Sequence, residues 1–425
     1  MRKNYLHLDF KGITPLAHKW PEYLEHFHDL GFNGLILELD CKYAWQTWQG
    51  ATLDHYSKND IESMISAAKK LGFGVSLLIQ IQGHLEWALD KEKYSHLREK
   101  GFINELCPSN PDAVKKVEEW IDEAIELCPD APYLHLGGDE VWHLCSCPEC
   151  VKNSENQPDK KMTVFLKHLK HCCQKVIDAG KQPMIWSDMF VSRQCYEPIK
   201  SLPAGTIIVN WCYHEKAPFA GLQEMLATGY EIWGSPAIRC GWFPDYLSGL
   251  YDEKGISDRI ANIRQWQQTG LNLLNTVWGR PSSLNMLYAP WHCFADAFAA
   301  AGSCGANWLA ATADDNFAAQ SRLWQELDEE YRKLFIRGKL VFQCSVALNR
   351  VRKYLGRRPG LFKADCFDQS EKLAADIEVL RKKLQKFFAD NQLSDADEFI
   401  DERLSMLTPA IEMPENAELE MSEVL

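Results

Sequence analysis

The chain has 425 residues, of which 46% are hydrophobic and 25% charged, a balance typical of a soluble globular protein with a large core. Its formal net charge of -13 argues against a surface for nucleic acid, because an acidic protein repels phosphate groups unless it carries a basic stripe. The basic N-terminus lacks the apolar stretch of a signal peptide or membrane span, so we expect no membrane partner.

Apolar runs alternate with amphipathic segments from residue 5 to residue 308. We predict eight strands, at residues 5–10, 34–40, 74–80, 133–137, 183–188, 206–211, 230–235 and 273–278. Between them, residues 60–71, 111–127 and 163–179 have apolar side chains at three- and four-residue steps, which is typical of helices. This alternation predicts an α/β fold, a (β/α)8 TIM barrel formed by residues 1–312.

The connection between the third and fourth predicted strands, residues 83–132, is the longest inserted one. Within it, residues 104–108 form either a rim loop or a short extra strand. After Trp308 the pattern is helical only, with amphipathic segments at residues 321–339 and 371–389. We therefore predict a helical C-terminal region, residues 313–425. Its short apolar repeat favours packing on the barrel or on a neighbouring helix over a homodimer contact.

Fifteen cysteines are scattered through segments of buried character, and their number is odd. This usage favours free thiols in a reducing compartment and predicts a cytoplasmic protein. Cys145, Cys147 and Cys150, with His143 nearby, have a spacing that could ligate zinc. Because there is no obvious second Cys-x-x-Cys pair, we favour a packed thiol cluster and expect neither a metal nor an organic cofactor.

Polar and aromatic residues crowd the carboxyl ends of most predicted strands. They are Glu38, Asp40, His84, Asp139, Glu140, Trp186, Asp188, Tyr213, Trp233 and Trp278. In a TIM barrel these strand ends form the active-site face. Several independent ends that meet at one rim predict a single site.

The strongest local feature is His135-Leu136-Gly137-Gly138-Asp139-Glu140, directly after the fourth predicted strand. The two glycines allow the chain to bend sharply. Adjacent side chains of an extended segment face opposite ways, so the two carboxylates reach different parts of a pocket. Burial of both would raise the pKa of one, as a proton donor at neutral pH requires.

This histidine, glycine pair and Asp-Glu pair resembles the signature of family 20 glycoside hydrolases, the β-N-acetylhexosaminidases. The similarity is nearest to the short, cytosolic branch of the hexosaminidase D type. It extends from residues 5–12 through residues 79–85, which include Gly83-His84, to Trp278. The resemblance implies removal of terminal β-linked GlcNAc or GalNAc from a glycan or glycoconjugate, with retention of configuration.

The resemblance also implies the catalytic roles. Glu140 is expected to be the general acid and later the base, while Asp139 orients the 2-acetamido group of the substrate. The acetamide oxygen, rather than a protein carboxylate, attacks the anomeric carbon and forms an oxazolinium ion. Trp186, Trp233 and Trp278 are expected to form an aromatic box around the sugar.

Further positions resemble supporting residues of the family. Tyr213 is similar to a tyrosine that hydrogen-bonds the acetamide oxygen, with Trp211 as a less certain neighbour. Asp188 is similar to an acid that contacts a sugar hydroxyl or steadies the aspartate of the pair. His84 and His135 resemble histidines that support the acid by hydrogen bonds, and each has a purely structural role as its alternative.

Glu38 and Asp40 lie where this branch of the family has acids that could contact a sugar hydroxyl. Two positions depart from the better-known members: Lys11 replaces an arginine after the first strand, and Arg280 replaces a glutamate after the last-strand tryptophan. These departures leave the choice between gluco- and galacto-configured sugars open.

Three alternatives to this interpretation make different demands on the sequence. A chitinase-like barrel would need an Asp-x-x-Asp-x-Asp-x-Glu run, which the sequence lacks. A sugar-binding barrel without catalysis is disfavoured by the intact pair Asp139 and Glu140. A zinc-dependent hydrolase or zinc-stabilised protein would depend on Cys145, Cys147 and Cys150.

Overall fold

The computed structural model of the protein describes residues 2–52, 56–155, 157–213, 216–240, 253–279, 291–302, 316–355 and 360–408. Its parallel strands are β1 Asn4–Asp9, β2 Gly34–Glu38, β3 Gly74–Leu78, β4 Tyr133–His135, β5 Gln182–Trp186, β6 Ile207–Trp211, β7 Glu231–Ser235, β8 Ala237–Arg239 and β9 Leu273–Val277. Each strand pairs with the next along the chain through β7, β7 pairs with β9, and β9 pairs with β1. The sheet is therefore closed, which confirms the predicted (β/α)8 barrel.

The seventh predicted strand continues beyond residue 235. β7 pairs with β9 between Gly234 and Leu273, and β8 pairs with the same strand between Ala237 and Thr276. Pro236 interrupts the two, because proline has no N–H to donate, but its carbonyl accepts a hydrogen bond of 2.9 Å from Thr276 N. β7 and β8 thus fill one position in an eight-position barrel.

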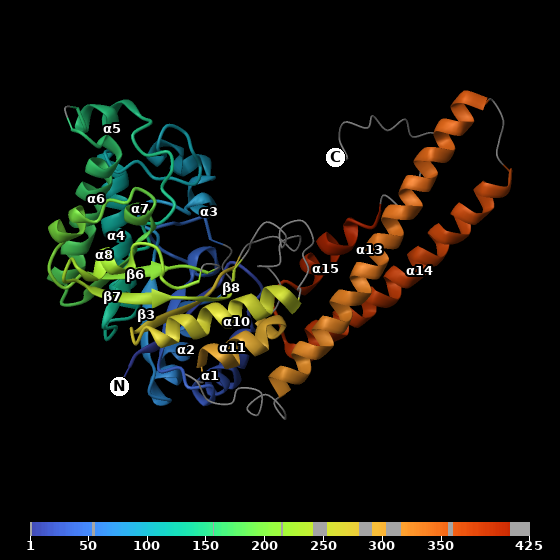
Figure 1. Cartoon of the computed structure of the whole chain (residues 1–425), viewed down its shortest axis with the longest axis horizontal. Coiled ribbons are helices and arrows are strands. Elements are labelled where there is room, and N and C mark those ends of the chain that lie inside the picture. Colours follow the sequence, from blue (N-terminus) through green and yellow to red (C-terminus); the bar gives the residue numbers. More distant parts are fainter. Residues whose placement is uncertain are drawn as a thin grey trace.

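Helices surround this barrel (Figure 1). They are α1 Trp20–Asp29, α2 Lys58–Lys70, α3 Glu86–Leu89, α4 Pro111–Leu127, α5 Pro148–Asn153, α6 Lys160–Asp178, α7 Asp188–Val191, α8 Leu222–Leu226, α10 Glu253–Gln268 and α11 Ala295–Gly302. The start of α2 is fixed by a capping box in which Ser57 and Asp60 satisfy each other's backbone N–H groups. α2, α4 and α6 confirm the three helices predicted between the strands.

Alternation along the strands creates two cores. Odd and even residues of a strand face opposite sides, so one set fills the barrel and the other packs under the helices. Tyr5, Tyr133 and Trp233 form one layer of rings inside the barrel. Two residues further along their strands, the inward positions become the imidazoles of His7 and His135. The interior thus changes from apolar to polar toward the carboxyl ends of the strands.

The C-terminal region is helical, as predicted, in α13 Asn316–Leu355, α14 Gly360–Asn391 and α15 Ala396–Ser405. α13 and α14 form a long hairpin that extends away from the barrel (Figure 1). Its base contacts the barrel, where Ser394 N donates to Thr14 O at 2.9 Å and Leu16 N donates to Gln392 O at 3.0 Å. The predicted boundary at residue 312 lies outside the described residues, and the homodimer contact stays a prediction. Within the described part of the chain, no helix combines the length and apolarity needed to cross a membrane.

Candidate active site

The turn after β4 places the two acidic residues at the carboxyl end of the barrel. Gly137 and Gly138 have φ angles of 61° and 83°, a left-handed conformation that glycine adopts without strain. A Cβ atom on Gly137 would overlap the side-chain amide of Gln80. A Cβ atom on Gly83 would likewise meet the carbonyl oxygen of Asp139. Close backbone approach therefore explains why glycine occupies both positions.

The two carboxylates have different surroundings. Asp139 is 5% exposed, and its Oδ1 is buried without a hydrogen-bond partner among the described residues. Glu140 has a side chain that is 42% exposed and a φ angle of 51°, which is a strained value for a residue with a Cβ atom. One carboxylate is thus enclosed while its neighbour reaches the open side of the site.

His84 lies between the two carboxylates. Its Nε2 is 3.3 Å from Asp139 Oδ2 and 3.4 Å from Glu140 Oε2. The residue itself has a φ angle of 53°, so the backbone is held in a sparsely populated conformation at this position as well. The predicted contact of His84 with the acid is therefore present.

Asp188 is the first residue of α7, just after β5, and it lies beside the two adjacent acids. Its Oδ2 accepts a hydrogen bond of 3.0 Å from Glu140 N. Burial, followed by the negative charges of Asp139 and Glu140, raises the pKa of Asp188 to about 7. A proton held on Asp188 reduces the repulsion that Asp139 would otherwise meet.

Aromatic side chains continue from the carboxylates into the barrel. Tyr213 accepts a hydrogen bond of 2.9 Å from Trp278 Nε1 and stacks on Trp211 with the ring centroids 5.1 Å apart. Burial and the nearby charge of Asp139 both raise the pKa of Tyr213 well above its usual value, so it stays a neutral phenol. Trp186 lies beneath, 5.7 Å from Trp278 between ring centroids.

The structure does not bring Trp233 to this group. Its ring is fully buried 5.3 Å from Tyr5 and 5.6 Å from Tyr133, which lie near the amino ends of β1 and β4. Trp233 is only the third residue of β7, and the strand position continues to Arg239. Its ring therefore belongs to the apolar layer of the barrel, beneath the polar one.

Glu38 and Asp40 form a buried charge cluster around Lys11. The Lys11 ammonium is 3.0 Å from Glu38 Oε1, 2.6 Å from Asp40 Oδ2 and 3.1 Å from Asp9 Oδ1. Although burial opposes it, Lys11 and His7 hold the pKa of Glu38 well below its usual range. Burial and the adjacent carboxylates raise the pKa of Asp40 to about 8.

These contacts pair the carboxylate oxygens of Glu38 and Asp40 with groups of the protein itself, with the exception of one oxygen. Asp40 Oδ1 is buried and has no hydrogen-bond partner among the described residues. Lys11, identified from the sequence only as a departure from the family, therefore orders the acids after the second strand. Arg280, the other departure, lies outside the described residues.

His135 is an interior residue rather than a contact of the acid. Its Nδ1 accepts a hydrogen bond of 3.0 Å from Gly137 N, and its ring is 4.3 Å from Trp186. Burial and the neighbouring His7 lower its pKa well below the usual value, so the imidazole is neutral. His135 thus supports the site by shaping the glycine turn.

Two members of the site were missed from the sequence. His7 Nε2 is 2.9 Å from Glu38 Oε2, and Gln80 Nε2 donates to Glu38 Oε1 at 3.3 Å. Both are polar residues within the predicted strands at residues 5–10 and 74–80, which are rich in apolar residues. That interruption was the available signal, because a polar group buried in a strand needs a partner or a ligand.

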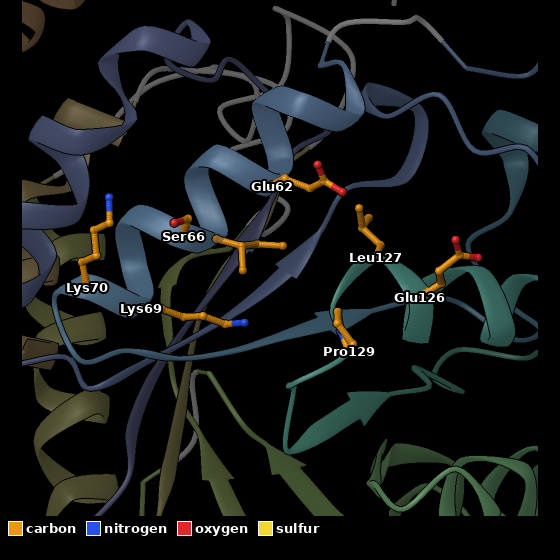
Figure 2. Close-up of a pocket in the computed structure, with 8 residues that line it drawn as sticks. Glu62, Ser66, Lys69, Lys70, Glu126, Leu127 and Pro129 are labelled. Carbon is orange, nitrogen blue, oxygen red and sulfur yellow. The ribbon is translucent and has the colours of Figure 1, made fainter.

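A separate hollow of roughly 500 Å³ lies on the outer wall of the barrel, between α2 and α4 (Figure 2). It is lined by Glu62, Ile65, Ser66, Lys69, Lys70, Glu126, Leu127 and Pro129. None of Asp139, Glu140 and Asp188 lines this hollow. Its mixed charges and its place in the helix layer separate it from the mouth of the barrel.

A closed (β/α)8 barrel in which an Asp-Glu pair follows the fourth strand, with aromatic rings beside it, defines the site of a glycoside hydrolase. Residues 29–269, more than half of the chain, match the catalytic domain of glycosyl hydrolase family 20. The chain therefore belongs to glycoside hydrolase family 20.

Two curated relatives agree with this family. The chain is 29% identical over 189 residues to Hexosaminidase D of Bos taurus, which covers 43% of this chain and 55% of the bovine protein. The identity to Hexosaminidase D of Homo sapiens is also 29% over 189 residues, covering 43% of this chain and 39% of the human protein. The match thus spans about half the length of the bovine protein and less of the human one.

The solved structure of a β-N-acetylhexosaminidase from Bacteroides fragilis has a similar fold. Its TM-score to this chain is 0.53 at 17% identity, and the superposition covers 77% of this chain and 71% of that chain. At this identity the likeness concerns the fold alone.

Proposed function

We propose that the protein is a retaining exo-β-N-acetylhexosaminidase that removes a terminal β-linked GlcNAc or GalNAc from a glycan or glycoconjugate. The observation that carries the proposal is that Asp139 Oδ1 is buried and has no hydrogen-bond partner among the described residues. An unpaired buried carboxylate oxygen is costly in a folded protein. A substrate amide N–H would satisfy it.

In this proposal Asp139 accepts a hydrogen bond from the acetamide N–H and turns the acetamide oxygen toward the anomeric carbon. That oxygen forms a bond to the anomeric carbon as the glycosidic bond breaks, and Glu140 donates its proton to the departing oxygen. The cationic oxazolinium that results is stabilised by the negative charge of Asp139. Because its pKa is raised to about 7, Asp188 holds a proton below that pH and then adds no negative charge beside Asp139.

In the second half of the reaction Glu140, now a carboxylate, takes a proton from a water molecule. The water oxygen attacks the anomeric carbon from the face that the leaving group vacated, and the acetamide is restored. Two inversions give net retention. His84, within 3.4 Å of both carboxylates, holds them in their relative orientation through the two steps.

Partners and location follow from the same proposal. The partner is a glycan with a terminal N-acetylhexosamine, and the chemistry requires no cofactor. Eleven cysteines have side chains that the structure describes, and none of these is in a disulfide, which supports work in a reducing compartment such as the cytoplasm.

The test is hydrolysis of paired chromogenic β-N-acetylglucosaminide and β-N-acetylgalactosaminide, with and without a thiazoline analogue of the oxazolinium ion. Turnover that the thiazoline inhibits is the expected result, and the faster substrate reports the sugar preference. The matched glucoside, which has a hydroxyl in place of the acetamide, should be hydrolysed poorly. Equal rates would contradict substrate assistance, and binding of the thiazoline without turnover would indicate a sugar-binding barrel instead.

A further inference from the structure

Four potential metal ligands meet behind the loop that follows the catalytic pair. They are Glu99, Cys107, Cys147 and Cys150, all buried, and their ligand atoms lie within 4.8 Å of one another. Two come from the long connection after β3 and two from the connection after β4. Neither Glu99 nor Cys107 is near the other two in sequence, so spacing alone did not indicate the set.

The distances match a tetrahedral zinc site. Cys107 Sγ is 3.4 Å from Cys147 Sγ and 3.7 Å from Cys150 Sγ, and Cys150 Sγ is 3.2 Å from Glu99 Oε2. Zn–S bonds of about 2.3 Å and a Zn–O bond of about 2.0 Å in a regular tetrahedron give S···S separations of about 3.8 Å and S···O separations of about 3.5 Å. A small outward movement of each ligand would admit the ion.

The local backbone is arranged to hold anionic ligands. Cys147 and Cys150 belong to a Cys-Pro-Glu-Cys turn in which Cys147 is the N-cap of α5, and its Sγ accepts a hydrogen bond of 3.3 Å from Cys150 N. Glu99 Oε1 accepts hydrogen bonds of 2.7 Å from Ser146 N and Cys147 N. The other oxygen of Glu99 is directed at the thiols. Backbone N–H groups thus face the carboxylate and one of the sulfur atoms.

Two residues that the sequence offered as ligands are engaged elsewhere. Cys145 Sγ is 3.3 Å from the carbonyl oxygen of Lys160, on the side toward α6. The ring of His143 stacks on Phe102 with the centroids 3.7 Å apart, and its Nδ1 is 2.8 Å from Glu105 Oε1. Neither is part of the four-ligand group.

We propose that Glu99, Cys107, Cys147 and Cys150 bind one Zn²⁺ ion in a structural site. The thiols release their protons to solvent as the metal binds, and the ion offsets the charge of a carboxylate that is fully buried. The four protein ligands fill the coordination sphere, which is the arrangement of a structural rather than a catalytic zinc. A disulfide is the alternative, but it needs sulfur atoms about 2.05 Å apart and would leave Glu99 without a cation.

The site would fasten the rim loop to the segment that carries the catalytic pair. Cys147 is seven residues after Glu140, and Cys107 lies within the rim loop, residues 104–108. A second buried carboxylate makes the same connection, because Glu105 Oε1 accepts hydrogen bonds from Trp142 N at 2.8 Å and His143 N at 2.9 Å. The metal would therefore stabilise the mouth of the barrel without taking part in the reaction.

The first experiment is elemental analysis of the full-length protein after purification without chelators and after equilibration with zinc. We expect about one zinc per chain and loss of most of it in C107S and C150S. C145S is the matched control, since it removes a neighbouring thiol outside the group, and it should keep its zinc. Absence of bound zinc under both conditions, or equal loss from C145S, would overturn the proposal.

A second measurement does not depend on variants that fold. Cobalt exchanged into the wild-type chain should give the intense visible bands of tetrahedral thiolate ligation, and zinc should abolish them. Weak bands of the octahedral type would contradict the ligand set.

Counting free thiols in the denatured, unreduced protein tests for the alternative disulfide. Two missing thiols that a reductant restores would also overturn the proposed zinc site. None of these readouts depends on hydrolysis, so they are independent of the proposed glycosidase activity.

Discussion

At the scale of single residues, the adjacent acids of the site are distinguished by their surroundings rather than by their chemistry. Asp139 is enclosed and has one unpaired oxygen, whereas Glu140 reaches solvent and donates its backbone N–H to Asp188. The mechanism proposed above needs one carboxylate that is held in place and one that reaches the departing oxygen. In that proposal the division of roles follows from the difference in burial.

Replacing Glu140 with Gln removes the proton but keeps the size and the backbone hydrogen bond. We expect hydrolysis of substrates with poor leaving groups to fall about 100- to 10,000-fold, the usual contribution of a general acid. A substrate whose leaving group needs no proton should lose much less in its first step. Thiazoline binding should be nearly unchanged. Steady-state rates on both substrate types check this, and undiminished turnover would contradict the role of Glu140.

Asp188 predicts a pH-dependent contribution to stability. Its pKa is raised to about 7 in the folded protein, above the value of about 3.9 for an unfolded chain. Between these values the folded state keeps a proton that the unfolded state has lost. The contribution of Asp188 to the free energy of unfolding therefore falls as pH rises through this window and becomes constant above about pH 7.

The variant D188N should lack this contribution while its side-chain oxygen still accepts the hydrogen bond from Glu140 N. Urea unfolding of both proteins should show the variant gaining about 2 kcal/mol relative to the wild type between about pH 5 and about pH 7. The comparison cancels titrating groups that do not interact with Asp188, such as Asp40. A difference that stays constant across this range would show that Asp188 titrates normally.

At the scale of elements, the turn after β4 determines where both acids lie. Gly137 and Gly180 both have positive φ, at 61° and 77°, but only Gly137 has a neighbour in the way of a Cβ atom. Both G137A and G180A should lose about 1 kcal/mol from backbone strain. G137A should lose more, and it should also lower kcat because the overlap with Gln80 shifts Asp139. Thermal unfolding and kinetics of the two variants test this, and equal behaviour would contradict it.

The strands of the barrel show which features of the site could be predicted from the sequence. The ends of the strands could be predicted, because apolar runs and polar tips indicate where a barrel strand stops. Asp139, Glu140, His84 and Asp188 do come together. The depth of a side chain within the barrel could not be predicted, because a strand buried on both faces has no polar alternation to fix it. For this reason the sequence predicts Trp233 at the rim, whereas its ring lies in the layer of Tyr5.

Contacts between distant connections were also beyond the sequence. Cys107 and Glu99 reach Cys147 and Cys150 only because two loops fold against each other at the mouth of the barrel. The spacing of Cys145, Cys147 and Cys150 suggested a local cluster, and the structure replaces one of its members. Non-local pairing of loops depends on the whole packing arrangement, which periodicity does not encode.

At the scale of the whole molecule, the described residues join the C-terminal helices to the barrel through α13 and through the segment after α14. Phe317 of α13 stacks on His26 of α1 with the ring centroids 4.4 Å apart. The segment after α14 adds backbone hydrogen bonds between residues 392–394 and residues 14–16, and an ion pair between Asp395 and Lys42. Lys42 lies two residues after Asp40, so this contact reaches the edge of the charge cluster around Lys11.

We therefore predict that the barrel depends on its C-terminal region. A chain that ends at residue 312 should expose the part of α1 that Phe317 covers, at Tyr23 and His26, and lose the contact with Lys42. We expect this to lower the midpoint of thermal unfolding by about 5 °C or more. A chain that ends at residue 408 keeps every described helix and should unfold like the full-length protein. Calorimetry of the three chains tests this. If the shortest chain kept the full-length midpoint and activity, the barrel would be an independent domain, and the helical hairpin would need another role, such as the predicted contact between two copies.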